Sequence, residues 1–253
     1  MDTSIWSCPL SGTRYMTRRW TASEQRWSNR RGTSVNSMQS NAADSPGTDP
    51  RTTDPDHDQK WNQLLAIMHD RGLIRFDEPR QLSSGEMSLD FIDAKRALSF
   101  GADLWLAAGI ICDSVTARGI EFSAAGGLTM GADHLAHAVA LYRSQVLGSP
   151  TEWFVVRKAP KGRGTNQTVE GAALSPESKV LLLDDIVTTG GSIIQAYERV
   201  TQETGATVVA AVTMVDRSGL ANKFFADQGV PYLPVFTYSD LGIDPIGQGS
   251  AAL

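Results

Sequence analysis

Val180-Leu-Leu-Leu-Asp-Asp-Ile-Val-Thr-Thr-Gly-Gly-Ser192 is the stretch that decides the fold of this chain. Its leading apolar residues, 180–183, have the length and composition of a strand buried on both faces of a sheet. We expect the adjacent carboxylates of Asp184 and Asp185 to lie where this strand ends. A small turn rich in hydroxyl groups and glycine follows at 188–192, and the amphipathic stretch at 193–200 predicts a helix.

Strand, turn and helix N-terminus together predict an anion site. The backbone N–H groups of the turn would point at one spot, the helix dipole favours negative charge there, and Thr188, Thr189 and Ser192 add hydroxyl donors. A Walker-type phosphate loop is excluded, because no lysine follows the glycines. Two carboxylates beside a phosphate cradle suit a ligand with neighbouring hydroxyl groups, such as a ribose 5-phosphate. The alternative is a chance strand–turn–helix unit with surface aspartates.

The composition is that of a cytosolic-type enzyme. The chain has 253 residues, 41% of them hydrophobic, which is enough for one or two domains with a real core. Its net charge of −5 argues against a nucleic-acid partner, for which a basic surplus is typical. Cys8 and Cys112 cannot build a disulfide framework or a zinc site, so we expect a reducing, cytoplasmic location. The longest apolar run, 104–112, is too short to cross a bilayer, which predicts no membrane partner.

Residues 1–56 predict a disordered N-terminal extension and linker. They are rich in Ser, Thr, Asn, Arg and Pro and lack apolar periodicity. Up to Met38 the segment is rich in arginine and poor in acids, which is also typical of an organellar transit peptide; alternatively, Met38 is the true start. We expect the folded domain at 57–245 and a flexible tail at 246–253.

From residue 61 onward helical and strand patterns alternate, which predicts an α/β fold. The expected helices are 61–71, 100–118, 132–145, 192–203 and 220–228. The expected strands are 120–124, 152–157, 179–183, 207–215 and 232–237, with short strands in 73–92 broken at 83–85. Such alternation implies a central, mostly parallel sheet flanked by helices, with its ligand site beyond the carboxyl ends of the strands.

A glycine-rich stretch, Gly126 to Asp133, is expected as a loop between a strand and a helix. Glycines let the backbone approach an anion, so we interpret the loop as a second anion site; the steric needs of a tight turn are the alternative. His134 and His137 are three residues apart on the next helix. Without a third ligand nearby, a helix-surface or capping role is favoured over metal binding.

The segment 157–167 carries four cations within seven residues, among glycines and a proline. A solvated basic surface loop is the plain interpretation. Because the chain is acidic overall and the cluster follows an apolar strand, we expect instead a mobile cationic lid. Such a lid would neutralise the charge of a pyrophosphate group and exclude water.

The stretch 180–192 resembles the phosphoribosyl-pyrophosphate (PRPP) motif of type I phosphoribosyltransferases at nearly every position. From about 61 to 242 the chain is similar to orotate phosphoribosyltransferases, which make orotidine monophosphate from orotate and PRPP. The matching segments are 82–85 and 90–93 (a hood segment that contacts the base), 127–133 (the pyrophosphate-side loop), 157–161 (the catalytic loop), 215–217 (a strand end whose arginine meets the orotate carboxylate) and 229–241 (the closing strand).

This resemblance implies the type I phosphoribosyltransferase fold, with a small hood subdomain at about 73–95 plus a C-terminal part. It implies PRPP and orotate as substrates, and a homodimer whose mobile loop reaches the partner's site. Mg²⁺ would bind through PRPP, with no certain protein ligand. The two aspartates would hold the ribose hydroxyls, directly or through the metal. The implied catalytic residues are Lys158, Lys161, Arg163, Asp184 and Asp185; the PRPP-binding residues are Arg157, Thr129, Asp184, Asp185, Ile186, Val187, Thr188, Thr189, Gly190, Gly191 and Ser192; the orotate-binding residues are Ser83, Phe91, Thr188 and Arg217.

The chain departs from the family pattern at a few positions. Arg163 replaces the usual loop histidine, and arginine keeps the charge and the donors but cannot act as a neutral base. Ser83 stands where some members carry a base-contacting lysine. Glu86 and Asp90 add negative charge near an anionic substrate, which is unfavourable if they face the pocket.

Two rival functions remain open. One is a type I transferase acting on another nucleobase, which Arg217 disfavours because a neutral base gives this arginine nothing to bind. The other is a non-catalytic PRPP-binding regulator. The intact pair of Lys158 and Lys161 disfavours the regulator, and so does the lack of a helix-turn-helix pattern or a basic stripe for DNA.

Overall fold

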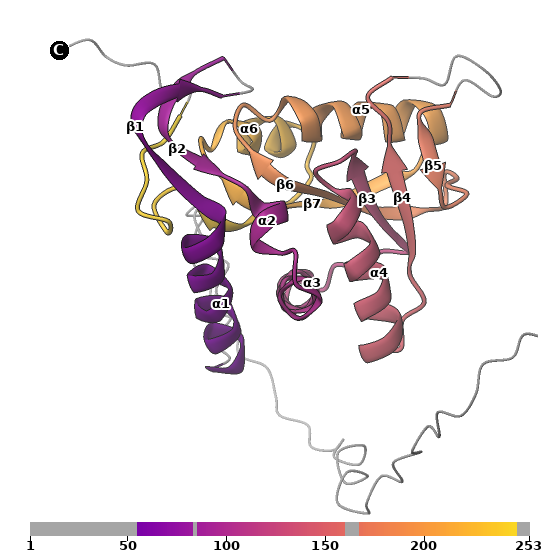
Figure 1. Ribbon diagram of the computed structural model, residues 1–253. Coiled ribbons are helices and arrows are strands. Elements are labelled where there is room, and N and C mark those ends of the chain that lie inside the picture. Colours follow the sequence, from indigo (N-terminus) through magenta and orange to yellow (C-terminus); the bar gives the residue numbers. More distant parts are fainter. Residues whose placement is uncertain (1–54, 83–84, 160–166, 247–253) are drawn as a thin grey trace, which may run out of the picture. The chain divides into compact units, whose positions relative to one another are not determined.

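The computed structural model of the protein describes residues 55–82, 85–159 and 167–246 (Figure 1). Three predicted site residues, Ser83, Lys161 and Arg163, lie outside these ranges, as do the predicted N-terminal extension up to residue 54 and the tail from 247. Within the described ranges, no helix has the length and apolar character needed to cross a membrane.

A six-stranded sheet forms the centre of the domain, in the order β5-β4-β3-β6-β7-β8. Neighbouring strands are parallel, except that β5 runs antiparallel to β4. The predicted α/β class with a mostly parallel sheet is therefore confirmed. The strands are β3 (Ala124–Leu128), β4 (Glu152–Val156), β5 (Val169–Gly171), β6 (Lys179–Val187), β7 (Thr207–Asp216) and β8 (Tyr232–Thr237).

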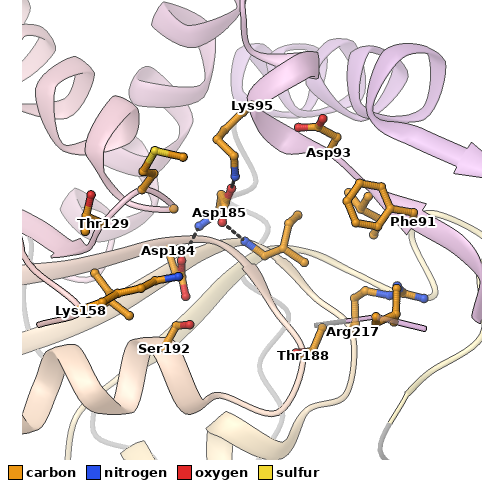
Figure 2. Close-up of a pocket in the computed structure, with 16 residues that line it drawn as sticks. Phe91, Asp93, Lys95, Thr129, Lys158, Asp184, Asp185, Thr188, Ser192 and Arg217 are labelled. Carbon is orange, nitrogen blue, oxygen red and sulfur yellow. Dashed lines mark hydrogen bonds and ion pairs between the residues drawn. The ribbon is translucent and has the colours of Figure 1, made fainter. Parts of the chain in front are cut away.

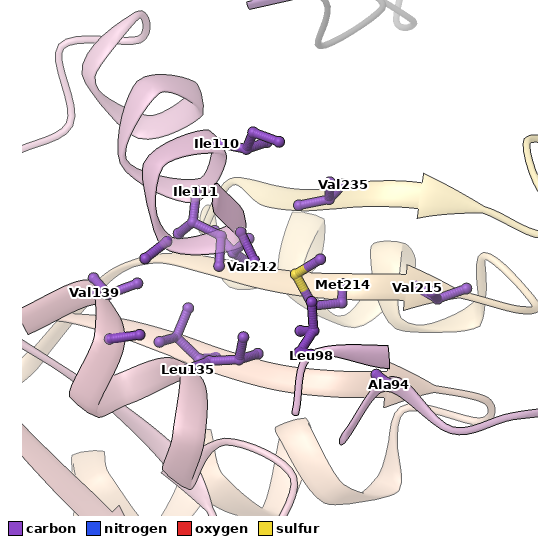
Figure 3. Close-up of a cluster of buried hydrophobic side chains, with 14 of the residues drawn as sticks. Ala94, Leu98, Ile110, Ile111, Leu135, Val139, Val212, Met214, Val215 and Val235 are labelled. Atoms are coloured by element: carbon purple, nitrogen blue, oxygen red, sulfur yellow. The ribbon is translucent and has the colours of Figure 1, made fainter. Parts of the chain in front are cut away.

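Helices cover both faces of this sheet (Figure 1). The central strand β6 is apolar on both sides: Leu181 and Leu183 belong to one buried cluster, and Leu182 belongs to the other. Figure 3 shows the first cluster, where helix residues such as Ile110 and Leu135 lie against the strands. The helices of this face are α3 (Gly101–Thr116) and α4 (Asp133–Val146), and those of the opposite face are α5 (Gly191–Thr204) and α6 (Leu220–Asp227).

A separate antiparallel pair, β1 (Leu73–Gln81) and β2 (Met87–Ile92), lies at the position expected for the hood. Helix α1 (Pro55–Ile67) and a π-helical turn (Met68–Gly72) lead into it, and the short helix α2 (Ala94–Ala97) leads out. Helix α1 begins before the predicted start at 61, and acidic residues in its first turn suit the positive end of the helix dipole.

The strand before the glycine-rich stretch lies four residues later than predicted, at 124–128 instead of 120–124. Gly126 and Gly127 are therefore strand residues, and their predicted place in an anion-binding loop is wrong. The physical reason is close packing between strands. A Cβ on Gly126 would lie 2.2 Å from the carbonyl oxygen of Phe154, and one on Gly127 would lie 2.1 Å from that of Leu183.

Strand β6 continues to Val187, beyond its predicted end at 183. Ile186 and Val187 keep pairing with β7, so the acidic pair lies inside the strand and not past its end. The neighbour β3 pairs with β6 only as far as Leu182. From that point the edge of β6 toward β3 has no strand partner among the described residues, and the acidic pair follows directly.

The sheet reverses its strand order between β3 and β6. From this central pair the chain proceeds to β4 and β5 on one side and to β7 and β8 on the other. Such a reversal opens a crevice outside the carboxyl ends of the two strands, where α/β proteins bind their ligands. The acidic pair on β6 lies at this crevice.

Candidate active site

A pocket of about 360 Å³ occupies the crevice, a volume typical of small-molecule sites. Figure 2 shows its lining, with the acidic pair between Lys158 and Thr129 on one side and Phe91 and Arg217 on the other. A second cavity of about 410 Å³ adjoins it along the turn 188–192. The fold thus brings together side chains from the hood, β6, α5 and the end of β7, as the resemblance implied.

The acidic pair is buried. Asp184 is 3% exposed and Asp185 is 6% exposed, so the expectation of carboxylates at an open strand end is wrong. The Oδ1 atom of Asp184 accepts the backbone N–H of Asp185 at 3.0 Å, and Oδ1 of Asp185 accepts that of Ile186 at 2.8 Å. The Oδ2 atom of Asp184 is buried and has no hydrogen-bond partner in the described structure. It is therefore a polar atom available to hydrogen-bond with a ligand.

The two carboxyl groups differ in their surroundings. Burial, and then the charge of Asp185, raise the pKa of Asp184 to about 8. In the ligand-free protein Asp184 is therefore mostly protonated at neutral pH. Asp185 forms an ion pair with the ammonium group of Lys95 from α2. Sequence analysis missed Lys95, which precedes Asp185 by 90 residues and carries no local motif.

Gly131 is the residue of the β3–α4 loop that closes over the acidic pair. A Cβ on Gly131 would lie 2.4 Å from Oδ1 of Asp184 and 2.7 Å from Oδ1 of Asp185. In the same loop, the backbone N–H of Thr129 donates to the Val156 carbonyl at 2.8 Å. The loop is thus held against β4 at one end and against the carboxyl groups at the other, so a side chain at 131 would displace those groups.

The turn 188–192 leads into α5, one residue earlier than predicted. Gly190 has a left-handed backbone (φ 88°), and a Cβ there would lie 3.1 Å from that of Ala221. The carbonyl of Thr188 accepts a hydrogen bond from the Ser218 hydroxyl. The first N–H groups of a helix have no intrahelical acceptors, so the start of α5 presents free donors to the second cavity.

Helix α5 also holds both ends of the segment that carries Lys158. Arg199 donates to the backbone carbonyls of Arg157 and Lys158, the latter at 3.0 Å. One turn later, Glu203 accepts from the backbone N–H of Thr168 at 2.8 Å and from its hydroxyl at 2.5 Å. The N–H of Arg157 donates to the Thr168 carbonyl at 2.9 Å and joins the two ends. One helix therefore supports the turn 188–192 and the basic segment.

The two basic residues at the end of β4 differ in position. Lys158 lines both cavities. Arg157 lines neither, and its guanidinium group forms an ion pair with Glu170 of β5 at 3.2 Å. Arg157 therefore contacts neither cavity directly, and the PRPP-binding role expected of it stays a prediction.

At the other end of the pocket, Phe91 is 42% exposed, whereas Arg217 is 2% exposed. Arg217 donates to the Asp90 carbonyl at 3.0 Å and to the Ser88 hydroxyl at 3.2 Å, and thereby ties the end of β7 to the hood. Its Nε–H has no partner in the described structure. This buried donor suits an anionic group of a ligand.

Acidic residues near Arg217 offset its charge. Burial lowers the pKa of Arg217, and the charges of Asp90 and Glu86 act in the opposite direction. The carboxylate of Asp90 is itself paired with Arg75 at 2.9 Å. The concern that Asp90 opposes an anionic substrate is therefore reduced, because its charge already has a cationic partner.

The histidines of α4 lie in different surroundings within the fold. The ring of His137 lies 4.4 Å from that of Trp153, and burial lowers the pKa of His134. Within the described ranges, no group of three or more His, Cys, Asp or Glu residues is arranged to hold a metal ion.

Comparisons with known proteins agree on one family. The chain is 40% identical over 183 residues to an orotate phosphoribosyltransferase of Streptomyces coelicolor, which covers 72% of this chain and 97% of that protein. It is 35% identical over 182 residues to the enzyme of the same name from Aquifex aeolicus, covering 71% of this chain and 96% of that one. No model of a known protein family matches the chain.

Solved structures agree with the sequence relatives. The structure resembles the orotate phosphoribosyltransferase of Mycobacterium tuberculosis in complex with PRPP, with a TM-score of 0.59 and 28% identity. The match covers 73% of this chain and 99% of that one. A complex of the same enzyme with Fe(III) dicitrate gives a TM-score of 0.62 at 29% identity, with the same coverage.

Proposed function

Because this chain belongs to the orotate phosphoribosyltransferase family, we propose that it transfers the 5-phosphoribosyl group from PRPP to orotate. The products are orotidine 5'-monophosphate and pyrophosphate, and the reaction serves pyrimidine nucleotide synthesis. The observation that carries the proposal is the place of the acidic pair. It lies between the turn 188–192, the side chain of Lys158, and the end of the pocket that is lined by Phe91 and Arg217.

The turn 188–192 binds the 5-phosphate of PRPP. Free N–H groups at the start of α5, the helix dipole and the hydroxyl groups of Thr188, Thr189 and Ser192 converge on the second cavity. No lysine is needed there, because backbone donors supply the binding. This arrangement fixes one end of the ribose.

The acidic pair holds the ribose hydroxyls. Oδ2 of Asp184 is buried and has no partner, so a ribose hydroxyl that hydrogen-bonds to it satisfies a polar atom that is unpaired in the free protein. Departure of pyrophosphate leaves positive charge on the anomeric carbon, and nearby carboxyl oxygens stabilise that charge. Loss of the proton from Asp184 would strengthen this effect.

Cationic side chains stabilise the leaving pyrophosphate. Lys158 lines both cavities and is the described residue best placed for this role; Lys161 and Arg163 are proposed to join it. The site lacks a protein-only metal cage among the described residues, and its two carboxyl groups fit a Mg²⁺ ion that arrives with PRPP. Such an ion would neutralise charge on the pyrophosphate oxygens.

Phe91 and Arg217 bind the base. The exposed ring of Phe91 offers a flat apolar surface for the pyrimidine, and Arg217 faces its carboxylate. The nucleophile is a ring nitrogen of an anionic pyrimidine. Its lone pair forms the new N–C bond while the C–O bond to pyrophosphate breaks, so no strong protein base is required.

We further propose a homodimer as the active unit. The support is apolar surface on two helices of one sheet face: Trp105 of α3 is 41% exposed and Leu141 of α4 is 58% exposed. The ring of Trp105 lies 5.0 Å from that of Tyr142, so exposed aromatic surface of α3 adjoins α4. Such faces are typically covered by a second subunit. The cytoplasmic location stays a prediction from the cysteine content.

The proposed reaction is tested by incubating the protein with PRPP, Mg²⁺ and orotate, uracil or adenine in turn. We expect orotidine 5'-monophosphate and pyrophosphate in equal amounts with orotate, and no nucleotide with the neutral bases. Asp184→Asn serves as the matched variant with slowed reaction. Product with a neutral base alone would identify a transferase of another specificity, and PRPP binding without any product would identify a regulator.

A further inference from the structure

Lys95 connects the hood to the acidic pair. It lies in α2, a single turn that begins at Asp93, whose side chain accepts the backbone N–H of Arg96 at 3.0 Å. Ala94 and Ala97 of the same turn are buried, which directs Lys95 and its neighbour outward. The ammonium group of Lys95 meets the Oδ2 atom of Asp185.

This ion pair contributes little to the stability of the fold. The side chain of Lys95 is 49% exposed, and ion pairs of such exposed groups are weak because water screens them. The carboxylate side chain of Asp185, by contrast, is only 9% exposed. The ammonium group of Lys95 can therefore exchange one acceptor for another with little loss of free energy. The carboxylate of Asp185 is enclosed and stays in place in the pocket.

The position of Lys95 complements that of Lys158. In Figure 2, Lys95 reaches the acidic pair from the hood side, and Lys158 reaches the same region from the side of Ser192. Both side chains line the same pocket. A ligand whose ribose lies on the acidic pair would therefore have one ammonium group on each side.

We propose that Lys95 is a PRPP-binding residue with two successive partners, Asp185 in the free protein and the pyrophosphate group of PRPP in the complex; this inference rests on the proposed function. Among the described residues, Lys95 is the one cation that forms an ion pair with Asp185. When the ribose hydroxyls engage Asp185, the ammonium group therefore loses its acceptor. The pyrophosphate oxygens offer a stronger one, since the charge on them grows as the C–O bond breaks. Lys95 thus acts from the short helix α2, and it complements the basic segment after β4.

The test compares two ligands that differ only in the pyrophosphate group. Binding of PRPP and of ribose 5-phosphate is measured by calorimetry with Mg²⁺ and without orotate, for wild type, Lys95→Met and Lys95→Arg. Arg96→Met is the matched control, because Arg96 is the adjacent exposed cation and does not line the pocket. We expect Lys95→Met to weaken PRPP binding about tenfold or more, the usual worth of one charge-assisted contact.

Ribose 5-phosphate should bind wild type and Lys95→Met alike, and Lys95→Arg should recover most of the PRPP affinity. Equal losses for both ligands would overturn the proposal, because Lys95 would then act only through Asp185. Unchanged PRPP binding in Lys95→Met would overturn it as well. If Lys95→Met fails to fold, Lys95→Gln takes its place in the same comparison.

Failure of the proposed function gives a different result. A protein that binds PRPP through Lys95 but forms no nucleotide from orotate would refute the transferase proposal and leave the role of Lys95 intact. In an active enzyme, Lys95→Met should raise the KM for PRPP about tenfold while the KM for orotate stays within about twofold.

Discussion

Gly131 lies directly against Asp184: a Cβ carbon on the glycine would stand 2.4 Å from the carboxyl oxygen Oδ1. The contact joins the β3–α4 loop to the PRPP motif, two segments that are far apart in the sequence. It also identifies which glycine of the predicted loop is required by the site. Gly126 and Gly127 serve strand packing instead.

Gly131→Ala should therefore lower activity far more than stability. The new methyl group would displace the carboxyl groups of Asp184 and Asp185, which are the flexible ends of side chains, so the backbone can stay in place. We expect a fall in kcat/KM of at least about 30-fold, equal to about 2 kcal/mol in the transition state. Gly101→Ala is the control, because a Cβ at Gly101 meets nothing within 4 Å. Equal activity of the two variants would contradict the assignment.

Asp184→Asn and Asp185→Asn should each slow the reaction. Loss of one charge-assisted contact in the transition state costs about 2–4 kcal/mol, which corresponds to about 30- to 1000-fold in rate. Steady-state kinetics with PRPP and orotate measure the effect. Wild-type rates in both variants would show that the acidic pair is not part of the site.

Asp184 should also set a pH dependence of stability. Its pKa is raised to about 8 in the folded protein, whereas an aspartate in an unfolded chain has a pKa of about 3.9. Between these values the folded state keeps a proton that the unfolded state has lost, so the free energy of unfolding falls as the pH rises from about 4 to about 8. Denaturant unfolding at about pH 5, 6, 7 and 8 should show Asp184→Asn gaining stability relative to wild type. A constant difference across this range would contradict the raised pKa.

Residues 1–37 should be dispensable. Their composition offers too little apolar surface to form a core. A chain that starts at Met38 should keep the activity and the melting temperature of the full chain. A marked fall in either would show that the segment packs on the domain, for which Trp6, Trp20 and Trp27 are the natural contacts.

Mixed subunits should test the proposed dimer. Lys161→Ala and Asp184→Asn chains are each expected to be nearly inactive. If the segment with Lys161 serves the site of the partner subunit, a hybrid dimer has one site with both groups intact, and mixing restores activity. Labelled subunits verify the exchange. Inactive mixtures after verified exchange would mean that the segment acts in its own subunit or that the protein is a monomer.

The sequence predicted the central features because they are encoded locally. A buried apolar strand, two carboxylates and a hydroxyl-rich turn before a helix are contiguous from Val180 to Ser192, and β6 and α5 follow this pattern. Boundaries were less accurate where packing overrides local signals. Strand β3 was placed too early because Gly126 and Gly127 are typical of turns, whereas here close strand contacts demand them.

Other features depend on contacts between distant residues and leave no local pattern. Lys95 is an ordinary lysine until α2 brings it to Asp185, 90 residues away. The burial that raises the pKa of Asp184 comes from segments distant in the sequence, so the local pattern places the two aspartates at a strand end and gives no sign of their burial. Strand β5, at three residues, is too short to show a period.

Helix α5 has a consequence for protein engineering. It begins at the phosphate turn and, further along, fastens both ends of the basic segment through Arg199 and Glu203. A chimera that borrows residues 159–167 from a relative would acquire new side chains, but the described residues at its two ends would still be held by Arg199 and Glu203. Transplanting the segment together with its own α5 would replace these two contacts as well, and with them the start of the helix at the phosphate turn. Residues 159–167 and helix α5 are therefore best exchanged together.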